Sequence, residues 1–597
     1  MSRAIRIANF SGAAGDYFGA LHDAVHGDPV DVLVGDYLAE IAFGLVLQRA
    51  VDAGNPKVQR EFFFDIFLRQ VMPELPAIAE KGLKVVTNAG AFNPEGMARE
   101  LRRSIAEAGL DLKVATVCGD DLLPRVQELA AQGQLASLDT GLPMGNLSGR
   151  IIAANAYLGG WGIAEALRQG ADIVVTGRVT DASLTMGPAA WWHDWSKSDW
   201  DAVAGGIAAG HILECGPQAS GGNYSGFRAL DEDVVRLGFP IGEIEADGSF
   251  VITKQSGSKG FVTPDTVKAQ LLYEIQGPRY LNPDAVLHID SLEIAQEGED
   301  RVRVGGVRGS RPPETTKVGC FYQDGWRFVM IVYVTGLDWR EKVAWIRNQL
   351  RSITESLALD EFHFEPLGQP IAAPANQGEA TMVVRIAAAA QELQEIERLG
   401  AGFATLGLGS IPGFTGEFGH LIAPRMEYWP GLARQRECEH RVTMADGSSA
   451  IVELPETDPA AGTSGKPAMP QPFDPARFGA TKAAPLGTVI HARSGDKGGD
   501  ASLGVWCKCP QAYDWLVAYL TGERVHALMG LREEVTVDAF PLPNIDGVLY
   551  VLRGHFGRSG TSNIALDQIG KGLGEFLRAC VAEIPVALLE EAADPVS

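Results

Sequence analysis

Short apolar runs and longer helical stretches alternate along roughly the first 180 residues of the chain. The apolar runs predict buried strands over residues 4–9, 30–34, 83–86, 112–117 and 171–176. Apolar residues at helical spacing predict helices over 36–53, 58–80 and 157–169, and others that begin near 94 and 120. Unbroken apolar strands that alternate with helices are typical of a parallel sheet covered on both faces. We therefore predict an α/β large domain with a doubly wound, Rossmann-like parallel sheet.

The pattern changes after about residue 235, where β-favouring residues and turn signals predict a β-rich section to about 335, as a second lobe or an insertion. Residues 457–475 contain five prolines, which predicts a semi-rigid linker over 457–483. Beyond the linker, strands and helices alternate again and predict a small α+β domain over 484–590. The 597 residues exceed what one hydrophobic core usually organises, so a large domain over 1–456 and a separate small one are expected.

Glycine and polar residues follow the predicted strands of the large domain at the points where the strands end. In open α/β sheets, ligands bind beyond the carboxyl ends of the strands, so we expect these residues to meet around a ligand. They are Gly12, Asp16, Asp36, Asn88, Asn93, Arg178 and Asp181. The two asparagines can hydrogen-bond an amide or carbonyl, although asparagine also simply suits tight turns. Asp36 and Glu40 lie one helical turn apart and can act as paired carboxylates, or can merely complement the helix dipole.

Two segments of the large domain carry the strongest catalytic candidates. Arg178 can clamp a carboxylate or phosphate while Asp181 orients it or acts as a base; a purely structural Arg–Asp pair is the equal alternative. His211, Glu214 and Cys215 gather acid, base and nucleophile types within five residues, and Tyr224 follows them after a glycine pair. Cys215 is more commonly explained as a small buried apolar residue.

Basic residues beside glycines are the candidates in the small domain. Arg493 and Lys497 flank glycines that let the backbone approach a ligand, and Arg558 stands in a second glycine-rich segment. A cradle for phosphate or carboxylate groups is one interpretation. The other interpretation is that these arginines pair with carboxylates and dock the small domain on the large one. The sequence alone does not distinguish the two interpretations.

The net charge of −24 argues against nucleic acid and anionic membrane surfaces as partners, because such a surface repels both. Seven scattered cysteines indicate a reducing compartment rather than a disulfide framework. The first residues contain no signal-peptide pattern, and no apolar run is long enough to span a bilayer. We expect a cytoplasmic protein that forms a homo-oligomer, a dimer or a tetramer.

Several of these motifs, taken in order, resemble a known family. Val85-Val-Thr-Asn-Ala-Gly90, Asn155-Ala-Tyr-Leu-Gly159, Thr176-Gly-Arg-Val-Thr-Asp181 and His211-Ile-Leu-Glu-Cys-Gly216 are similar to the large domain of the acyclic terpene utilisation protein A family. Ala492-Arg-Ser-Gly-Asp-Lys-Gly498 is similar to the ferredoxin-like domain appended to it. The chain departs from the family pattern at Ala91 and Pro217, where glycine is expected.

The resemblance implies catabolism of branched or terpenoid acids as CoA thioesters, but it supplies no catalytic residue set. The main hypothesis is an enzyme that hydrates or dehydrates a branched acyl-CoA, a hydro-lyase that needs an acid/base pair and an oxyanion site. One alternative is a hydrolase of an amide, ester or thioester, with Cys215 or a serine as nucleophile. The other is a non-catalytic partner of an acyl-CoA carboxylase. No metal and no cofactor are expected, with coenzyme A present only as part of the substrate.

Overall fold

The computed structural model describes residues 3–52, 54, 61–147, 149–417, 422–463, 465–467 and 473–592. The start of the predicted helix over 58–80 and six residues of the predicted linker (464 and 468–472) lie outside this described part. Within it, no helix combines the length and the apolar character needed to cross a bilayer.

An eleven-stranded sheet organises the large domain. Its centre is parallel, in the order β1 (Ile5–Ser11), β2 (Val32–Gly35), β3 (Lys84–Thr87), β6 (Ile173–Thr176) and β4 (Val114–Cys118). The other edge of β1 is occupied by antiparallel strands, in the order β7 (Pro240–Ile244), β8 (Phe250–Lys254), β12 (Arg301–Gly305) and β11 (Glu293–Gly298). Beyond β4 lie β19 (Arg441–Thr443) and β20 (Ser449–Ile451).

This strand order does not confirm the doubly wound, Rossmann-like arrangement. The parallel strands run outward from β1 in one direction only, because antiparallel β7 takes the edge from which a second winding would start. Much of the predicted β-rich section therefore extends the central sheet instead of forming a second lobe. This section begins with the hairpin β7–β8, whose turn lies between Ile244 and Phe250.

Helices cover both faces of the parallel strands, as the apolar pattern indicates. Val85 and Val86 of β3 point to opposite faces and belong to different core clusters. One face packs against α1 (Ala20–His26), α4 (Asp65–Val71), α5 (Leu75–Lys81) and α6 (Pro94–Glu107). The other packs against α8 (Trp161–Arg168), α9 (Ser183–His193) and α10 (Trp200–Leu213). The helix expected to begin near 120 begins only at Val126, as α7 (Val126–Ala131), and the one over 157–169 begins only at Trp161.

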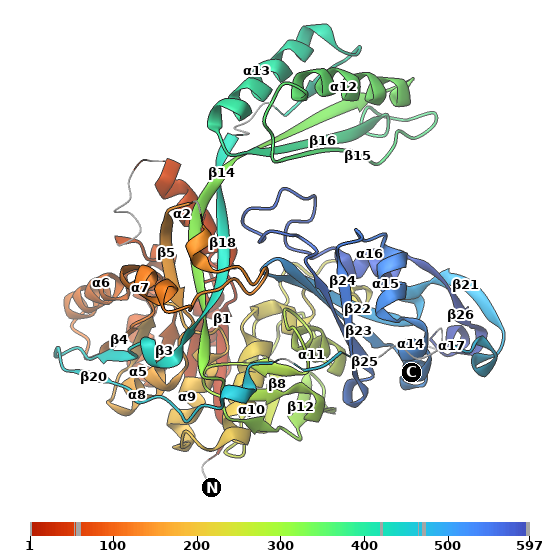
Figure 1. The fold of residues 1–597 in the computed structure, drawn as a ribbon. Coiled ribbons are helices and arrows are strands. Elements are labelled where there is room, and N and C mark those ends of the chain that lie inside the picture. Colours follow the sequence, from red (N-terminus) through yellow and green to blue (C-terminus); the bar gives the residue numbers. More distant parts are fainter. Residues whose placement is uncertain are drawn as a thin grey trace.

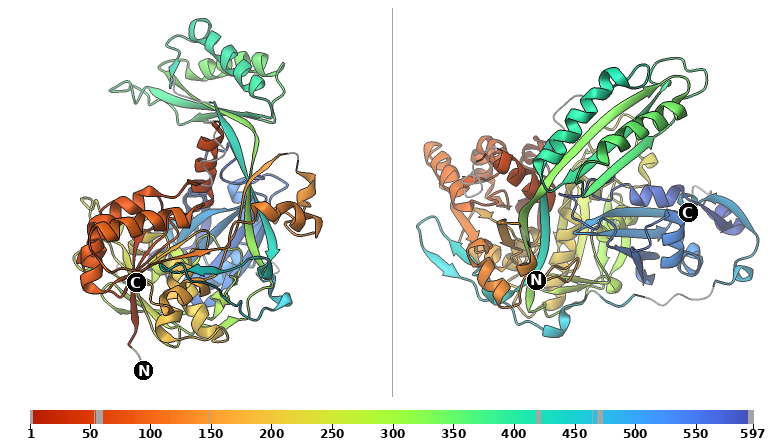
Figure 2. Two further views of the ribbon diagram at one scale, coloured as in Figure 1. Left: turned by 90° about the vertical axis from the view of Figure 1, so that its left-hand side faces the viewer. Right: turned by 45° about the horizontal axis from the view of Figure 1, so that its top comes forward.

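A stalk of two long strands carries a separate lobe away from this body (Figures 1 and 2). The strands are β14 (Thr315–Thr335) and β18 (Ile422–Arg434), and the lower half of β14 also pairs with β5 (Ile151–Ala156). Above an irregularity between Gln323 and Trp326, β14 pairs with β16 (Thr381–Ala390), followed by β15 (Glu361–Leu367). Helices α12 (Trp339–Thr354) and α13 (Leu393–Gly409) pack on one face of these strands, and α2 (Glu40–Asp52) packs on the stalk.

The small domain is a four-stranded antiparallel sheet in the order β22 (Ile490–Lys497), β23 (Asp500–Cys507), β25 (Gly547–Arg553) and β24 (Thr536–Leu542). Its outer face packs against α14 (Tyr513–Tyr519), α15 (Gly522–Met529) and α16 (Leu573–Ala579). The sequence from 570 to 584 has a helical pattern, but α16 ends at Ala579, and β26 (Val581–Pro585) then pairs with β21 (Thr481–Pro485).

The inner face of the small domain packs on the large domain. Trp506 is fully buried there and donates a hydrogen bond to Asp265 of α11 (Pro264–Leu271), with 2.9 Å between Nε1 and Oδ1. A three-stranded sheet of β9 (Arg279–Leu281), β10 (Val286–His288) and β13 (Gly309–Ser310) lies beside α10 in the same region. The small-domain sheet therefore has apolar packing on both faces: its own helices cover the outer face, and the large domain covers the inner face.

Candidate functional site

Two adjoining cavities lie where the ends of the parallel strands meet the small domain. Their volumes are about 210 and 280 Å³, and both are lined by Asp181, Glu274, Lys497 and Gly498. The first is also lined by residues that follow strands β1 and β2, by the end of α10, and by two segments of the small domain. Its lining includes Gly12, Asp36, Glu40, Glu214, Cys215, Asp496, Thr561 and Lys571.

The loop after β2 brings a buried carboxyl group to the first cavity. Asp36 accepts hydrogen bonds from the Asn88 side-chain amide (2.7 Å) and from the Leu38 backbone amide (2.9 Å). Burial raises the pKa of Asp36 well above its ordinary value, and the nearby Asp181 charge raises it further. Asn88, which follows β3, thus lies behind Asp36 and orients it without lining the cavity itself.

The loop after β6 supplies an arginine–aspartate pair. Arg178 is buried, donates to Asp181 at 2.8 Å and to the Leu38 carbonyl at 3.2 Å, and stacks on the Tyr157 ring at 4.0 Å. Asp181 faces both cavities, whereas Arg178 lines neither. The guanidinium therefore fixes the Asp181 carboxylate in the cavity wall and has little capacity left to clamp a ligand.

Glu40 remains ionised in the same wall. Its carboxylate accepts a hydrogen bond from Tyr157 (2.6 Å) and pairs with Lys317 of β14 (3.0 Å). Burial alone would raise the pKa of Glu40, but the charges of Lys317, Arg178 and Lys497 outweigh it and hold the pKa well below its ordinary value. The helix predicted over 36–53 begins only at Glu40, so Asp36 lies in the loop before α2, and the two carboxyl groups favour opposite protonation states.

The end of α10 supplies a second protonated carboxyl group. Glu214 Oε1 lies 3.1 Å from His211 Nδ1, while Glu214 Oε2 and His211 Nε2 are buried without a hydrogen-bond partner among the described residues. Burial raises the pKa of Glu214 well above its ordinary value, and burial lowers that of His211 to about 4. A neutral imidazole therefore backs a carboxylic acid that faces the first cavity.

Cys215 is poorly suited to act as a nucleophile. Burial raises the pKa of its thiol well above the ordinary value, and the neighbouring carboxyl groups of Glu214 and Glu274 raise it further. A reactive cysteine needs the opposite environment, one that stabilises the thiolate. Gly12 packs directly against this segment: a Cβ added at Gly12 would lie 2.7 Å from the Cys215 carbonyl carbon.

The small domain completes the cavities with cations. Lys571 Nζ lies 3.1 Å from Glu274 Oε1, and burial lowers the pKa of Lys571 to about 8. Burial raises the pKa of Glu274 to about 7, despite the Lys497 charge, and that of Asp496 to about 8. The pKa of Lys497 is raised, because Glu274 and Glu40 outweigh the effect of burial. Groups that exchange protons near neutral pH thus stand beside fixed positive charge.

Five predicted site residues are engaged elsewhere. Asn93 caps α6 by accepting from the Gly96 amide (2.9 Å), and Asp16 closes its own turn by accepting from the Gly12 amide (3.0 Å). Tyr224 and Arg493 join the two domains, through His491 (3.1 Å) and through Gln218 respectively. Arg558 pairs with Asp324, Glu361 and Glu427 at the base of the lobe. For Arg558 the structure therefore favours docking over phosphate binding, because three carboxylates already neutralise it.

Several cavity residues were missed by the sequence reasoning. Glu274 follows helix α11 in a left-handed conformation (φ 56°), Lys317 lies within β14, and Lys571 follows a glycine near the end of the chain. None of them follows a parallel strand, so the rule that found the other candidates could not find these. Among the described residues, only His22, His26 and Glu74 place three metal-ligating groups within 4.8 Å of one another, and they line neither cavity.

Comparisons with known proteins place the chain in a family. No curated protein and no solved structure is similar enough to count as a match. Two family descriptions match: residues 5–444 match "Acyclic terpene utilisation family protein AtuA", and residues 484–582 match "AtuA ferredoxin-like domain". Both cavities are built from residues inside these two matched regions, except for Gly462 in the second. The first match alone covers well over half of the 597 residues, so the chain belongs to the acyclic terpene utilisation family AtuA.

Proposed function

We propose that the protein is an enzyme of acyclic terpene utilisation that adds water to, or removes it from, a branched acyl-CoA. The family supports the metabolic setting. The cavity supports the chemistry, since hydration needs one group that removes a proton, one that delivers a proton, and a positive charge for the thioester oxygen. The first cavity holds all three kinds of group, contributed by both domains.

The observation that carries the proposal is the state of Glu214. Its side chain is only 9% exposed, one oxygen is held by His211, and the other is buried without a partner among the described residues while the residue lines the cavity. A buried carboxyl group that is kept protonated is a suitable general acid. An unpaired polar atom in such a place also calls for a hydrogen-bonding ligand, since leaving it unpaired is costly.

Glu274 and Lys497 supply the other two roles. The pKa of Glu274 is about 7, so its carboxylate form is available near neutral pH to accept a proton from water. The water oxygen then bonds to the β-carbon, and the electrons of the carbon–carbon double bond move toward the thioester oxygen. The Lys497 ammonium stabilises that oxygen, and Glu214 delivers its proton to the α-carbon. Dehydration is the reverse sequence.

The two cavities together suit a long, two-part substrate. The reacting acyl end fits the first cavity, where the carboxyl groups gather. The second cavity shares Lys497 and Glu274 with it and adds apolar walls such as Leu138, Ile275 and Pro283, which suit the pantetheine arm of coenzyme A. Residues from both domains therefore contact the same ligand.

The test incubates the full chain with a panel of branched enoyl-CoA and 3-hydroxyacyl-CoA thioesters and follows the gain or loss of water by mass spectrometry. Glu214→Gln is expected to lower turnover by at least about 100-fold, because it removes the proton donor. Glu107→Gln is the matched control, since Glu107 lies exposed on α6, and it is expected to have no effect. If the protein neither binds nor turns over any thioester of the panel, the proposal is overturned.

A variant of Cys215 distinguishes the proposed hydration from the alternative, a hydrolase with a cysteine nucleophile. Cys215→Ala is expected to retain turnover within about twofold, because the Cys215 thiol is held protonated. Activity that disappears in Cys215→Ala but persists in Glu214→Gln would favour the hydrolase. Circular dichroism of both variants shows whether each of them folds.

A further inference from the structure

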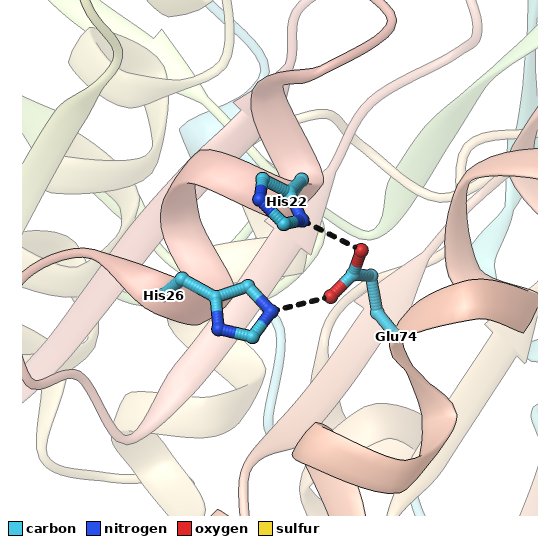
Figure 3. A group of neighbouring side chains, drawn as sticks. All are labelled: His22, His26 and Glu74. Atoms are coloured by element: carbon cyan, nitrogen blue, oxygen red, sulfur yellow. Dashed lines mark hydrogen bonds and ion pairs between the residues drawn. The ribbon is translucent and has the colours of Figure 1, made fainter.

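Three metal-ligating side chains meet on the helical layer of the large domain, outside both cavities (Figure 3). His22 and His26 lie one turn apart on α1, and Glu74 lies on the short 3-10 turn Met72–Glu74 that joins α4 to α5. The opposite side of α1 is buried against the sheet through residues such as Leu21 and Val25, so both imidazoles project outward. The spacing of four residues on a helix places the two rings on one face, with 4.5 Å between their centroids.

The Glu74 carboxylate lies between the two imidazoles and contacts each of them through a different oxygen. Glu74 Oε1 is 2.9 Å from His22 Nδ1, and Oε2 is 2.8 Å from His26 Nε2. The three candidate ligand atoms all lie within 4.8 Å of one another. Bonds of about 2.0–2.2 Å from Zn²⁺ to imidazole nitrogen and carboxylate oxygen therefore require only small movements of the side chains.

The exposure of the three side chains fits an open site. Glu74 is 10% exposed and is held in place by its surroundings, whereas His22 and His26 are 63% and 44% exposed. The histidines can therefore adjust around an ion, and solvent can fill the remaining coordination positions. Two nitrogen ligands and one carboxylate suit borderline metals such as Zn²⁺, Co²⁺ or Ni²⁺, whereas Mg²⁺ and Ca²⁺ prefer an all-oxygen shell.

We propose that His22, His26 and Glu74 form a binding site for a divalent transition-metal ion of the Zn²⁺ class. The ion replaces the hydrogen bonds between the imidazoles and the carboxylate with direct bonds. It thereby links α1 to the α4–α5 connection, two elements that pack on the same face of the central sheet. This site is independent of the hydration chemistry proposed for the cavities, because none of its residues lines them.

The test uses the full chain after treatment with a chelator and its removal. Zn²⁺ is titrated calorimetrically, and Co²⁺ is added to a second sample to read the coordination sphere from its visible absorption. Wild type is expected to bind one more equivalent of Zn²⁺ than His22→Gln, His26→Gln or Glu74→Gln. Loss of an outer-shell partner already lowers metal affinity by about 10- to 100-fold, so loss of a ligand is expected to weaken this equivalent at least about tenfold.

His526→Gln, a histidine substitution on α15 of the small domain, is the matched control and is expected to leave the binding unchanged. A rise of the unfolding temperature with Zn²⁺ in wild type, absent in Glu74→Gln, gives a second readout that does not depend on catalysis. His22 and His26 are exposed, so their glutamine variants are expected to fold. Equal Zn²⁺ stoichiometry and affinity in wild type and in all three ligand variants would overturn the proposal.

Discussion

At the scale of single residues, the cavity shows how one wall holds carboxyl groups in different protonation states. Glu40 stands beside Lys317 and Arg178 and stays ionised, whereas burial and the nearby carboxylates of Asp181 and Glu274 keep Glu214 protonated. Both groups are acidic residues in the same cavity, so their neighbours rather than their chemical type set the difference. Separated pKa values of this kind are what acid–base catalysis requires.

The pKa of Glu274 predicts the pH dependence of hydration. Glu274 must be ionised to accept a proton from water, and its pKa is raised to about 7. The value of kcat/KM for hydration is therefore expected to rise between pH 6 and 8, with a midpoint at about pH 7. Glu274→Gln is expected to lose most of the activity, and any residual activity should lack this rise. If kcat/KM of the variant still rises in the same way between pH 6 and 8, the rise belongs to the titration of another group.

Gly12 predicts a steric effect at the cavity wall. In Gly12→Ala the new Cβ would lie 2.7 Å from the Cys215 carbonyl carbon and 2.9 Å from the Glu214 carbonyl oxygen. The backbone atoms must move, and we expect the free energy of unfolding to fall by about 1–3 kcal/mol. Gly15→Ala in the same loop is the control, since nothing lies within 4 Å of its new Cβ. Urea unfolding compares the two, and equal stabilities would refute the predicted clash.

The candidates found from the sequence and those that it missed differ in a physical way. Asp36, Asn88, Arg178 and Asp181 could be predicted because a parallel sheet aligns the ends of its strands, so local pattern fixes where they lie. Glu274, Lys317 and Lys571 reach the cavity through the packing of α11, β14 and the small domain. That packing depends on contacts between segments hundreds of residues apart, which apolar periodicity does not encode.

At the scale of elements, β14 is the strand that joins the body to the lobe. Its irregularity between Gln323 and Trp326 lets one edge change partner from β5 to β16. Gly325 sits at this point with φ 83°, and a Cβ there would lie 2.3 Å from the Ala390 carbonyl oxygen. A glycine is required for both reasons, since the left-handed conformation and the close approach each exclude a larger residue.

Arg425 of β18 holds the same junction and predicts a large stability effect. Its side chain is fully buried and pairs with Asp324 (3.2 Å) and Asp360 (2.8 Å). Arg425→Ala leaves Asp360 without this cation and leaves Asp324 paired with Arg558 alone, and it is expected to lower the free energy of unfolding by about 3–5 kcal/mol. Arg436→Ala is the control, because Arg436 is 66% exposed and is expected to contribute less than about 0.5 kcal/mol. Thermal and denaturant unfolding measure both, and a small effect at Arg425 would contradict the prediction.

The elements themselves were largely predictable, whereas their partners were not. The parallel strands and several helices appear near the residues where the apolar pattern predicts them. The alternation in the β-rich section identifies strands but not the sheet edge at which each pairs, so β7, β8, β12 and β11 were not expected to extend the central sheet. The lobe could not be predicted either, because the two halves of β14 belong to different packing environments within one strand.

At the scale of the whole molecule, burial of many ionisable groups links stability to pH. Burial raises the pKa of Glu274 and Asp284 to about 7 and that of Asp496 to about 8. The folded protein therefore holds protons that the unfolded chain releases, since ordinary carboxyl pKa values lie near 4. These protons stabilise the fold at low pH, and the stabilisation is lost as the pH rises through 7 and 8.

The window from pH 6.5 to 8 isolates this effect. Buried His211, His440 and His491 have pKa values lowered to about 4, 4 and 3, so they destabilise the fold only below the ordinary histidine pKa of 6.5. We expect the free energy of unfolding to fall by up to about 3 kcal/mol across the window. Asp284→Asn, which keeps the side-chain shape, should make the fall shallower. Differential scanning calorimetry checks this, and a constant or rising unfolding temperature would exclude it.

The cavities take walls from Gly12 near the start of the chain and from Lys571 near its end. During synthesis the ribosome must therefore make the whole stretch from Gly12 to Lys571 before the pocket can close. A nascent chain that stops before the small domain has the strand ends and Glu214, but it has neither Lys497 nor Lys571. Premature termination or proteolytic loss of the small domain thus leaves an acidic hollow with Lys317 but without Lys497 and Lys571, and the order of translation sets when the cavities can close.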